Sequence, residues 1–289
     1  MSEAVCAARR TNILGEGPCW DAVRGRLYWV DIKGQTVEWL EPGGGGEGRV
    51  ALEVRPSALA PRGDGSLLVA SDRGCGVLDP DRGAFELRTV LEDDRPGNRS
   101  NDGGVDLAGR FWVGTMDDAE EHLSGALYRV DPDWTCTRVL DGLAIPNTVA
   151  VSPDGGTFYF GDSREQAVYA FDLDQAGHIA RQREFFDTRG TDASPDGSAV
   201  DAEGGLWNAQ WGAWRVVRYD AEGVMDRVVA LPVEQPTSCA FGGPNLDTLY
   251  VTSARVGLSG EALEAQPLAG SLFAIRTRVP GLPLPNFAG

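Results

Sequence analysis

The sequence predicts an all-β protein, a six-bladed β-propeller formed by residues 1–289 as a single domain, with the N-terminal strand closing the last blade. Three observations support this prediction. A turn followed by a short aromatic and β-branched run occurs six times, at intervals of 40 to 48 residues. A second run of similar length follows each copy, and periods of about 40 to 50 residues are typical of propeller blades. Apolar residues almost nowhere recur with the period of about 3.6 that a helix requires.

Each of the six copies contains two runs of strand length. The first runs, with their starting positions, are GRLYWVD (25), GSLLVAS (65), GRFWVGT (109), GTFYFGD (156), GGLWNAQ (204) and DTLYVTS (247). The second runs are TVEWLEP, CGVLDPD, ALYRVDP, AVYAFDL, RVVRYDA and SLFAIRT. Both sets are rich in Val, Tyr, Phe and Trp, and turns such as SPDGG and DAEGG separate them, as in an antiparallel meander. A β-sandwich is the alternative fold.

The two ends of the chain are expected to meet in the last blade. The C-terminal sequence VPGLPLPNFAG carries three prolines, which cannot donate hydrogen bonds to a sheet, so the last copy lacks a fourth strand. We expect residues 4–10 to supply it by lying beside residues 271–276. This pairing would close the ring and leave neither sheet edge open.

The composition excludes several classes of function. A net charge of −17 argues against binding to nucleic acid or to an anionic membrane surface. No window approaches 18 uninterrupted apolar residues and the N-terminus lacks a signal-peptide core, so we expect a cytoplasmic protein, with a monomer favoured and the oligomeric state otherwise open. Only two histidines, His122 and His178, are present, which excludes a three-histidine zinc site.

Polar residues occupy one shared register position in all six copies. The innermost strand of each blade is expected to start eight or nine residues before the repeated turn, which selects Glu16, Ser57, Asn101, Asn147, Asp196 and Ser238. Because the register is shared, these side chains should point at the same end of one axial channel. A single polar residue at a strand start is more often a turn former, and this stays the interpretation for Ser57 and Ser238.

Two carboxylates and two amides that converge favour a bound cation. Without a cation, neighbouring carboxylates repel and raise each other's pKa. Carboxylate and amide oxygens form a hard ligand set suited to Ca²⁺, Mg²⁺ or Mn²⁺. Three protein ligands would leave positions for water and substrate, as a catalytic site requires, although structural cation sites share this composition.

Five ordered motifs carry a resemblance to a known family. They are LGEGPCWD (14–21), NRSNDGGVDLAGRFWVGTM (98–116), IPNTVAVSPDGGTFYFGDS (145–163), SPDGSAVDAEGGLWNAQWG (194–212) and TSCAFGGPNLDTLYVTSAR (237–255). Together they make the chain similar to the regucalcin (senescence marker protein 30)/gluconolactonase family from about residue 12 to the C-terminus. The resemblance implies a six-bladed propeller, in agreement with the repeat count, and an enzyme that opens sugar lactones.

The resemblance implies a metal site and a substrate site. The cation would be held by Glu16, Asn147 and Asp196, with Asp196 also the catalytic residue. Its identity stays open among Ca²⁺, Zn²⁺, Mn²⁺, Mg²⁺ and Fe²⁺. Substrate contacts would fall on Arg99 and Asn101, with Asp102 supporting them.

A loop acid that contacts substrate in relatives cannot be aligned with certainty. Glu121 is our choice among the acids of this loop, with Asp118 and Glu120 as alternatives. The other interpretation of Arg99 is an ordinary ion pair with a surface acid such as Asp93 or Asp94.

The function expected from the resemblance is metal-dependent hydrolysis of an aldonolactone of the glucono-, xylono-, arabinono- or galactonolactone type. The small-molecule sugar lactone is the only partner expected. Two alternatives stay open. One is a non-catalytic propeller that binds calcium or a sugar acid, and the other is an esterase similar to calcium-dependent phosphotriesterases.

Overall fold

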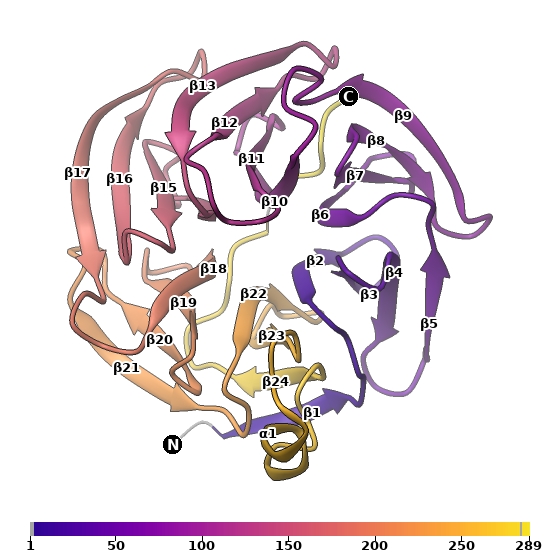
Figure 1. Cartoon of the computed structure of the whole chain (residues 1–289), viewed down its shortest axis with the longest axis vertical. Coiled ribbons are helices and arrows are strands. Elements are labelled where there is room, and N and C mark those ends of the chain that lie inside the picture. The colour runs from indigo at the N-terminus through magenta and orange to yellow at the C-terminus, as the bar shows by residue number, and fades with distance from the viewer. Residues whose placement is uncertain (1–2, 284) are drawn as a thin grey trace.

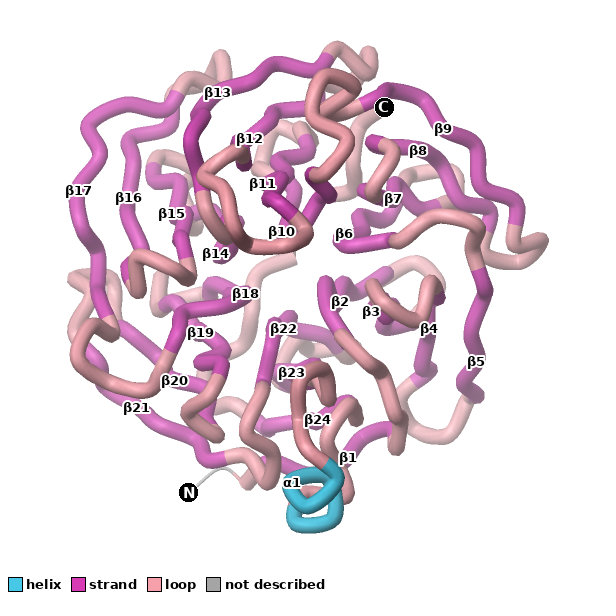
Figure 2. Tube along the Cα trace, viewed as in Figure 1, coloured by secondary structure: helices cyan, strands magenta, loops and turns pink. Residues whose placement is uncertain are grey.

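Six four-stranded antiparallel sheets surround a central axis (Figure 1). The computed structural model describes residues 3–283 and 285–289. The predicted six-bladed β-propeller is confirmed, and within the described residues one short helix, α1 (Gly260–Ala265), lies at the rim of the last blade (Figure 2). No helix in this part of the chain is long and apolar enough to cross a membrane.

The blades follow one another along the chain. Blade one contains β2 (Gly15–Asp21), β3 (Arg26–Asp31), β4 (Thr36–Glu41) and β5 (Gly46–Ala51). Blade two contains β6 (Pro56–Pro61), β7 (Leu67–Ser71), β8 (Gly74–Asp79) and β9 (Ala84–Val90). Blade three contains β10 (Asn98–Val105), β11 (Phe111–Asp117), β12 (Gly125–Val130) and β13 (Cys136–Leu143).

The second half of the ring repeats this order. Blade four contains β14 (Pro146–Val151), β15 (Thr157–Asp162), β16 (Ala167–Leu173) and β17 (Ile179–Asp187). Blade five contains β18 (Ser194–Val200), β19 (Leu206–Trp211), β20 (Arg215–Tyr219) and β21 (Met225–Ala230). Blade six contains β22 (Pro236–Gly242), β23 (Thr248–Ser253), β24 (Leu272–Arg276) and β1 (Ala4–Ala8). The six repeated aromatic runs therefore form the second strand of each blade.

The N-terminal strand closes the ring, as the sequence predicts. In β1, Ala4 pairs with Ile275 and Ala8 pairs with Leu272 in an antiparallel register. Blade six thus takes its outermost strand from the start of the chain and its other three strands from the end. This arrangement satisfies the edge of β24 with backbone hydrogen bonds.

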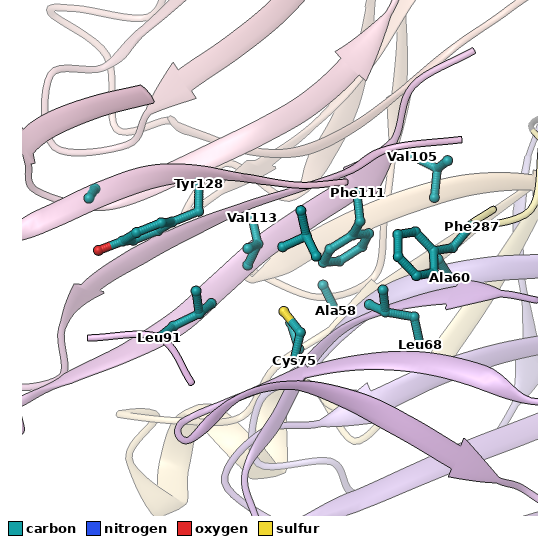
Figure 3. Packing of buried hydrophobic residues seen from close by; sticks show 13 residues of the cluster. Ala58, Ala60, Leu68, Cys75, Leu91, Val105, Phe111, Val113, Tyr128 and Phe287 are labelled. Atoms are coloured by element: carbon teal, nitrogen blue, oxygen red, sulfur yellow. The ribbon is translucent and has the colours of Figure 1, made fainter. Parts of the chain in front are cut away.

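The hydrophobic core lies in layers between neighbouring blades, because each sheet must bury both of its faces. Figure 3 shows one layer, in which Leu68 and Cys75 of blade two face Phe111 and Val113 of blade three. All four side chains are fully buried. Burying a large apolar side chain contributes about 1.5–3 kcal/mol, so each layer holds two blades firmly together.

The C-terminal segment runs behind the inner strands and ends near blade two (Figure 1). Gly281 forms an antiparallel bridge with Asp201 of blade five, and Phe287 forms a parallel bridge with Arg62 of blade two. The Arg62 guanidinium Nε also donates to the Gly289 carbonyl at 2.7 Å. The segment therefore ties blades on opposite sides of the channel at the end where the inner strands finish.

Candidate metal and substrate site

A register irregularity interrupts every inner strand at the predicted polar position. The six irregularities lie between Glu16 and Cys19, Pro56 and Ala58, Ser100 and Gly103, Asn147 and Ala150, Pro195 and Ser198, and Pro236 and Cys239. Unpaired residues in such a bulge bend the strand and redirect their side chains. The repeat therefore presents one set of polar groups per blade at the same level of the channel.

Buried aspartates at the ends of second strands fix where two of these bulges begin. The Asp31 carboxylate accepts the backbone N–H groups of Ile13 and Leu14 at 2.9 and 3.0 Å, just before Glu16. The Asp162 carboxylate does the same for the two residues that precede Pro146 and Asn147. These hydrogen bonds, which we call aspartate clamps, fix the backbone just before the inner strand begins. The backbone positions of Glu16 and Asn147 are thereby defined.

Glu16 and Asp196 are buried carboxylates with no ion pair among the described residues. Each is only 6% exposed, and each accepts a single hydrogen bond, from the N–H of the following glycine at 3.1 Å. Burial, followed by the negative charge of Asp102, raises the pKa of Glu16 to about 8. Burial and the charge of Glu16 raise the pKa of Asp196 well above its usual value. Two such acids side by side create a strongly negative site that a cation would relieve.

Asp102 lies at the boundary between these acids and a cavity further along the channel. Its carboxylate accepts the N–H groups of Gly103 at 2.9 Å and Val149 at 3.3 Å, and burial raises its pKa to about 6. The cavity measures about 490 Å³ and is lined by inner-strand residues that follow the polar positions and by parts of the C-terminal segment, including Leu282. Glu16, Asn147 and Asp196 are not among its lining residues. Asp102 lines this cavity and makes no hydrogen bond with Arg99 among the described residues, so its support of Arg99 and Asn101 stays a prediction.

Asn147 is held by hydrogen bonds on both sides of its amide. Its Oδ1 accepts a hydrogen bond from Asn101 Nδ2 at 3.1 Å, and its Nδ2 donates to Ser163 Oγ at 2.7 Å. The side chain is 3% exposed. The amide is thereby held with Oδ1 toward Asn101 and Nδ2 toward Ser163, and Oδ1 keeps a second lone pair, as a metal ligand requires.

Backbone strain accompanies this position. Thr148, a β-branched residue, has φ of 56°, which lies in the left-handed region that favours glycine. Such a residue costs about 1–3 kcal/mol and persists only where its surroundings hold it. Its hydroxyl donates to the Asp196 carbonyl oxygen at 2.6 Å, and Asn208 Nδ2 donates to the same oxygen at 2.9 Å. The strained residue thus joins the Asn147 bulge to the Asp196 bulge of the next blade.

Arg99 is buried, at 6% exposed, and lies beside Asn101 as predicted. Its Nη1 donates to Asn101 Oδ1 at 2.7 Å and to the Ser100 carbonyl at 3.0 Å. Its Nε donates to Asp118 Oδ1 at 2.8 Å. The acid that pairs with Arg99 is therefore Asp118 of the neighbouring loop, and not a surface acid such as Asp93 or Asp94.

The same geometry distinguishes the acids of the 117–124 loop. Arg55 Nη1 donates to Asp118 Oδ2 at 2.7 Å, so Asp118 bridges two arginines. Burial opposes ionisation of Asp118, but the hydrogen bond from Arg55 and the charges of Arg55 and Arg99 hold its pKa below the usual value. Glu121 is exposed, and only its backbone N–H is engaged, with Asp117. The structure thus brings Asp118, and not Glu121, to Arg99.

Sequence reasoning missed Arg55, Ser163, Thr148 and Asn208, and it named Asp118 only as an alternative to Glu121. Asp118 was one of three candidate acids, but the spacing along the loop contains no signal that selects it. Asn208 lies in the second strand β19 and Ser163 directly follows the second strand β15, and polar side chains there give no sequence sign of pointing at the channel. These contacts join residues that lie far apart in the sequence, and some of them, such as Thr148 with Asp196 and Arg55 with Asp118, join different blades, so no local pattern encodes them.

The donor set fits a divalent cation. Glu16 Oε1 and Asp196 Oδ2 accept no hydrogen bond from the described residues, and Asn147 Oδ1 adds a neutral oxygen. No group of three or more His, Cys, Asp and Glu side chains that could hold a metal occurs in the described ranges. The metal set of Glu16, Asn147 and Asp196 stays a prediction, with two free carboxylate oxygens and one amide oxygen as its ligand atoms.

Fold and site together define a six-bladed propeller with an acid-and-amide centre on its axis. The family model for the SMP-30/gluconolactonase/LRE-like region matches residues 14–255. The chain belongs to this family, which confirms the resemblance seen in the motifs.

Relatives and solved structures extend the match to nearly the whole chain. L-arabinolactonase from Azospirillum brasilense is 39% identical over 99% of this chain and 96% of its own length. A 6-deoxy-6-sulfogluconolactonase from Pseudomonas putida is 35% identical over the full length of both proteins. The crystal structure of regucalcin, a calcium-binding protein from Agrobacterium tumefaciens, is 36% identical, covers 98% of this chain and 97% of its own, and superposes with a TM-score of 0.93.

Proposed function

We propose that the protein hydrolyses a sugar lactone of the aldonolactone type, with one divalent cation bound by Glu16, Asn147 and Asp196. The observation that carries this proposal is the pair of buried carboxylates that make no ion pair among the described residues, together with an oriented amide and a buried arginine nearby. Relatives that match almost the whole chain are named lactonases, so the general class is a hydrolase of lactone esters.

The residues divide the chemistry between them. When bound, the cation would act as a Lewis acid that polarises the lactone carbonyl. Arg99 and Asn101 would orient the oxygens of the substrate at the entrance to the site. Asp196 would accept the proton of the water that attacks the carbonyl carbon, and would return it to the ring oxygen as the carbon–oxygen bond breaks. The product is the open-chain sugar acid.

Substitution of Asp196 tests this proposal. Asp196→Asn keeps the shape of the side chain but removes both the negative charge and the proton acceptor. We expect kcat/KM for sugar lactones to fall by about 10²- to 10⁴-fold, the usual contribution of a general base, together with a loss of bound metal. EDTA should abolish the wild-type activity, and one of Ca²⁺, Zn²⁺, Mn²⁺, Mg²⁺ or Fe²⁺ should restore it.

The exposed acid Asp81, which pairs with Arg24 in a surface turn, supplies the control. Asp81→Asn should leave activity and metal content unchanged. Full lactonase activity of the wild type in EDTA, together with full activity of Asp196→Asn, would reject the proposed site. A panel of glucono-, xylono-, arabinono- and galactonolactones would identify the substrate.

The similarity to a calcium-binding regucalcin favours one second candidate, a non-catalytic calcium-binding role. Both candidates use the same buried acids, so they differ only in turnover. Tight Ca²⁺ binding without hydrolysis of any lactone in the panel would select the second candidate.

A further inference from the structure

A chain of hydrogen bonds with one fixed direction links Arg99 to blade five. Arg99 Nη1 donates to Asn101 Oδ1 at 2.7 Å, and Asn101 Nδ2 donates to Asn147 Oδ1 at 3.1 Å. Asn147 Nδ2 donates to Ser163 Oγ at 2.7 Å, and Ser163 donates its single proton to the Pro195 carbonyl at 2.6 Å. Five residues from blades three, four and five are thereby connected.

Both ends of this chain permit only one direction. The guanidinium at one end can only donate, and the carbonyl oxygen at the other end can only accept. If either asparagine amide were rotated by half a turn, two donors would face each other at one contact and two acceptors at another. The hydrogen-bond pattern therefore fixes Asn147 Oδ1 toward Asn101 and Nδ2 toward Ser163, and leaves the second lone pair of Oδ1 for a metal ligand.

Ser163 holds the nitrogen side of the Asn147 amide and so maintains its orientation. It is 8% exposed and directly follows β15, where the Asp162 clamp holds the backbone. Because its proton is committed to Pro195, its oxygen is left to accept from Asn147 Nδ2. Pro195 immediately precedes Asp196. The Ser163 hydroxyl therefore contacts one proposed metal ligand, Asn147, and the backbone next to another, Asp196.

We propose that Ser163 is a positioning residue for the metal site, which orients the Asn147 amide and ties it to the Asp196 strand. This inference rests on the proposed metal site and assigns Ser163 no contact with the cation or the substrate. Groups that orient metal ligands typically contribute a factor of about 10 to 100 in metal affinity.

The test is the affinity of the metal-free protein for Mn²⁺, Zn²⁺ and Ca²⁺, each titrated alone in competition with a chromophoric chelator. Ser163→Ala should bind the preferred cation roughly 10- to 100-fold more weakly than the wild type. Ser163→Cys, which keeps the volume but offers only a weak donor, should shift affinity in the same direction even if Ser163→Ala folds poorly. Ser163→Thr keeps the hydroxyl and should remain close to wild type. At saturating metal, kcat of Ser163→Ala should recover most of the wild-type value.

Ser71 provides a matched control, since it is a buried serine of blade two whose hydroxyl donates to the Gly74 carbonyl at 2.9 Å. Ser71→Ala removes a comparable hydrogen bond and should leave metal affinity unchanged. Equal affinities of wild type, Ser163→Ala and Ser163→Cys would overturn the inference, as would an equal loss in Ser71→Ala. Absence of lactone hydrolysis by the wild type would reject the proposed function alone, because the affinity comparison does not depend on turnover.

Discussion

At the scale of single residues, Arg99 places a permanent positive charge beside a group of buried acids. Its Nε and Nη1 are occupied by Asp118, Asn101 and a backbone carbonyl. Its Nη2 makes no hydrogen bond within the described residues. A buried guanidinium with one free corner is suited to grip a substrate oxygen, because the rest of the fork is already held in place.

Replacement of this side chain should therefore separate substrate binding from metal binding. Arg99→Ala should lower kcat/KM for the lactone by about 10- to 100-fold, which corresponds to one charged hydrogen bond of roughly 1.5–3 kcal/mol. Metal content should stay at the wild-type level, since Arg99 offers no ligand atom. The control is Arg82→Ala, because the Arg82 side chain is 83% exposed. Lactonase kinetics unchanged by Arg99→Ala would place the substrate elsewhere on the propeller.

At the scale of the strand pair, blades three and five each contain a buried aspartate in the turn between their first and second strands. In blade five, Asp201 is fully buried and accepts hydrogen bonds from Trp207 Nε1 at 2.9 Å and Arg218 Nε at 2.6 Å. In blade three, Asp106 does the same with Trp112 and Arg110. The carboxylate thereby connects a tight turn, an aromatic second strand and a buried arginine.

Loss of one such carboxylate should cost stability rather than catalysis. Asp201→Ala leaves Trp207 Nε1 and Arg218 Nε without their carboxylate acceptor, while Arg218 keeps its ion pair with Asp226, and an unsatisfied buried donor typically costs about 1–3 kcal/mol. Urea unfolding should show this as a lower transition midpoint, while kcat at a temperature where the variant is folded stays near wild type. The exposed ion pair between Arg24 and Asp81 is the comparison. Asp81→Ala should shift the unfolding midpoint far less. An unchanged midpoint in Asp201→Ala would contradict this account of the turn.

At the scale of the whole molecule, the ring is closed by a strand that is mostly exposed to solvent. β1 buries little apart from Ala8, so backbone pairing with β24 is its main contribution. We propose that the chain is a single domain and unfolds as one unit, because every blade shares core layers with its neighbours. Opening the ring at blade six should then weaken all the blades together.

Removal of residues 1–8 tests this closure. The loss of a few backbone hydrogen bonds at about 1 kcal/mol each, or roughly 2–4 kcal/mol in total, should lower Tm by about 5–10 °C. The free edge of β24 should also promote aggregation. A shorter deletion of residues 1–3 keeps β1 and should change Tm little. Two separate transitions in the calorimetric trace, or an unchanged Tm after the longer deletion, would disprove the single closed unit.

The sequence by itself determined the architecture and the level of the site. The repeated aromatic runs and their turns are local patterns, and their period fixes the number of blades. Proline in the C-terminal segment predicts that the last strand comes from residues 4–10, and β1 occupies Ala4–Ala8. The polar register that includes Glu16, Asn147 and Asp196 was also within reach of sequence reasoning, because a repeat places residues of different blades at one height along the axis. The metal-binding role of these three residues stays a prediction.

Only the tertiary structure decided which groups touch. It selects Asp118 over Glu121 as the partner of Arg99, places Asp102 in the lining of the cavity, and brings Ser163 against Asn147. The physical reason is that these contacts join residues of separate strands and loops that only the fold brings together. They depend on how far each bulge turns its side chain and on the path of each loop, and neither leaves a periodic trace in the chain.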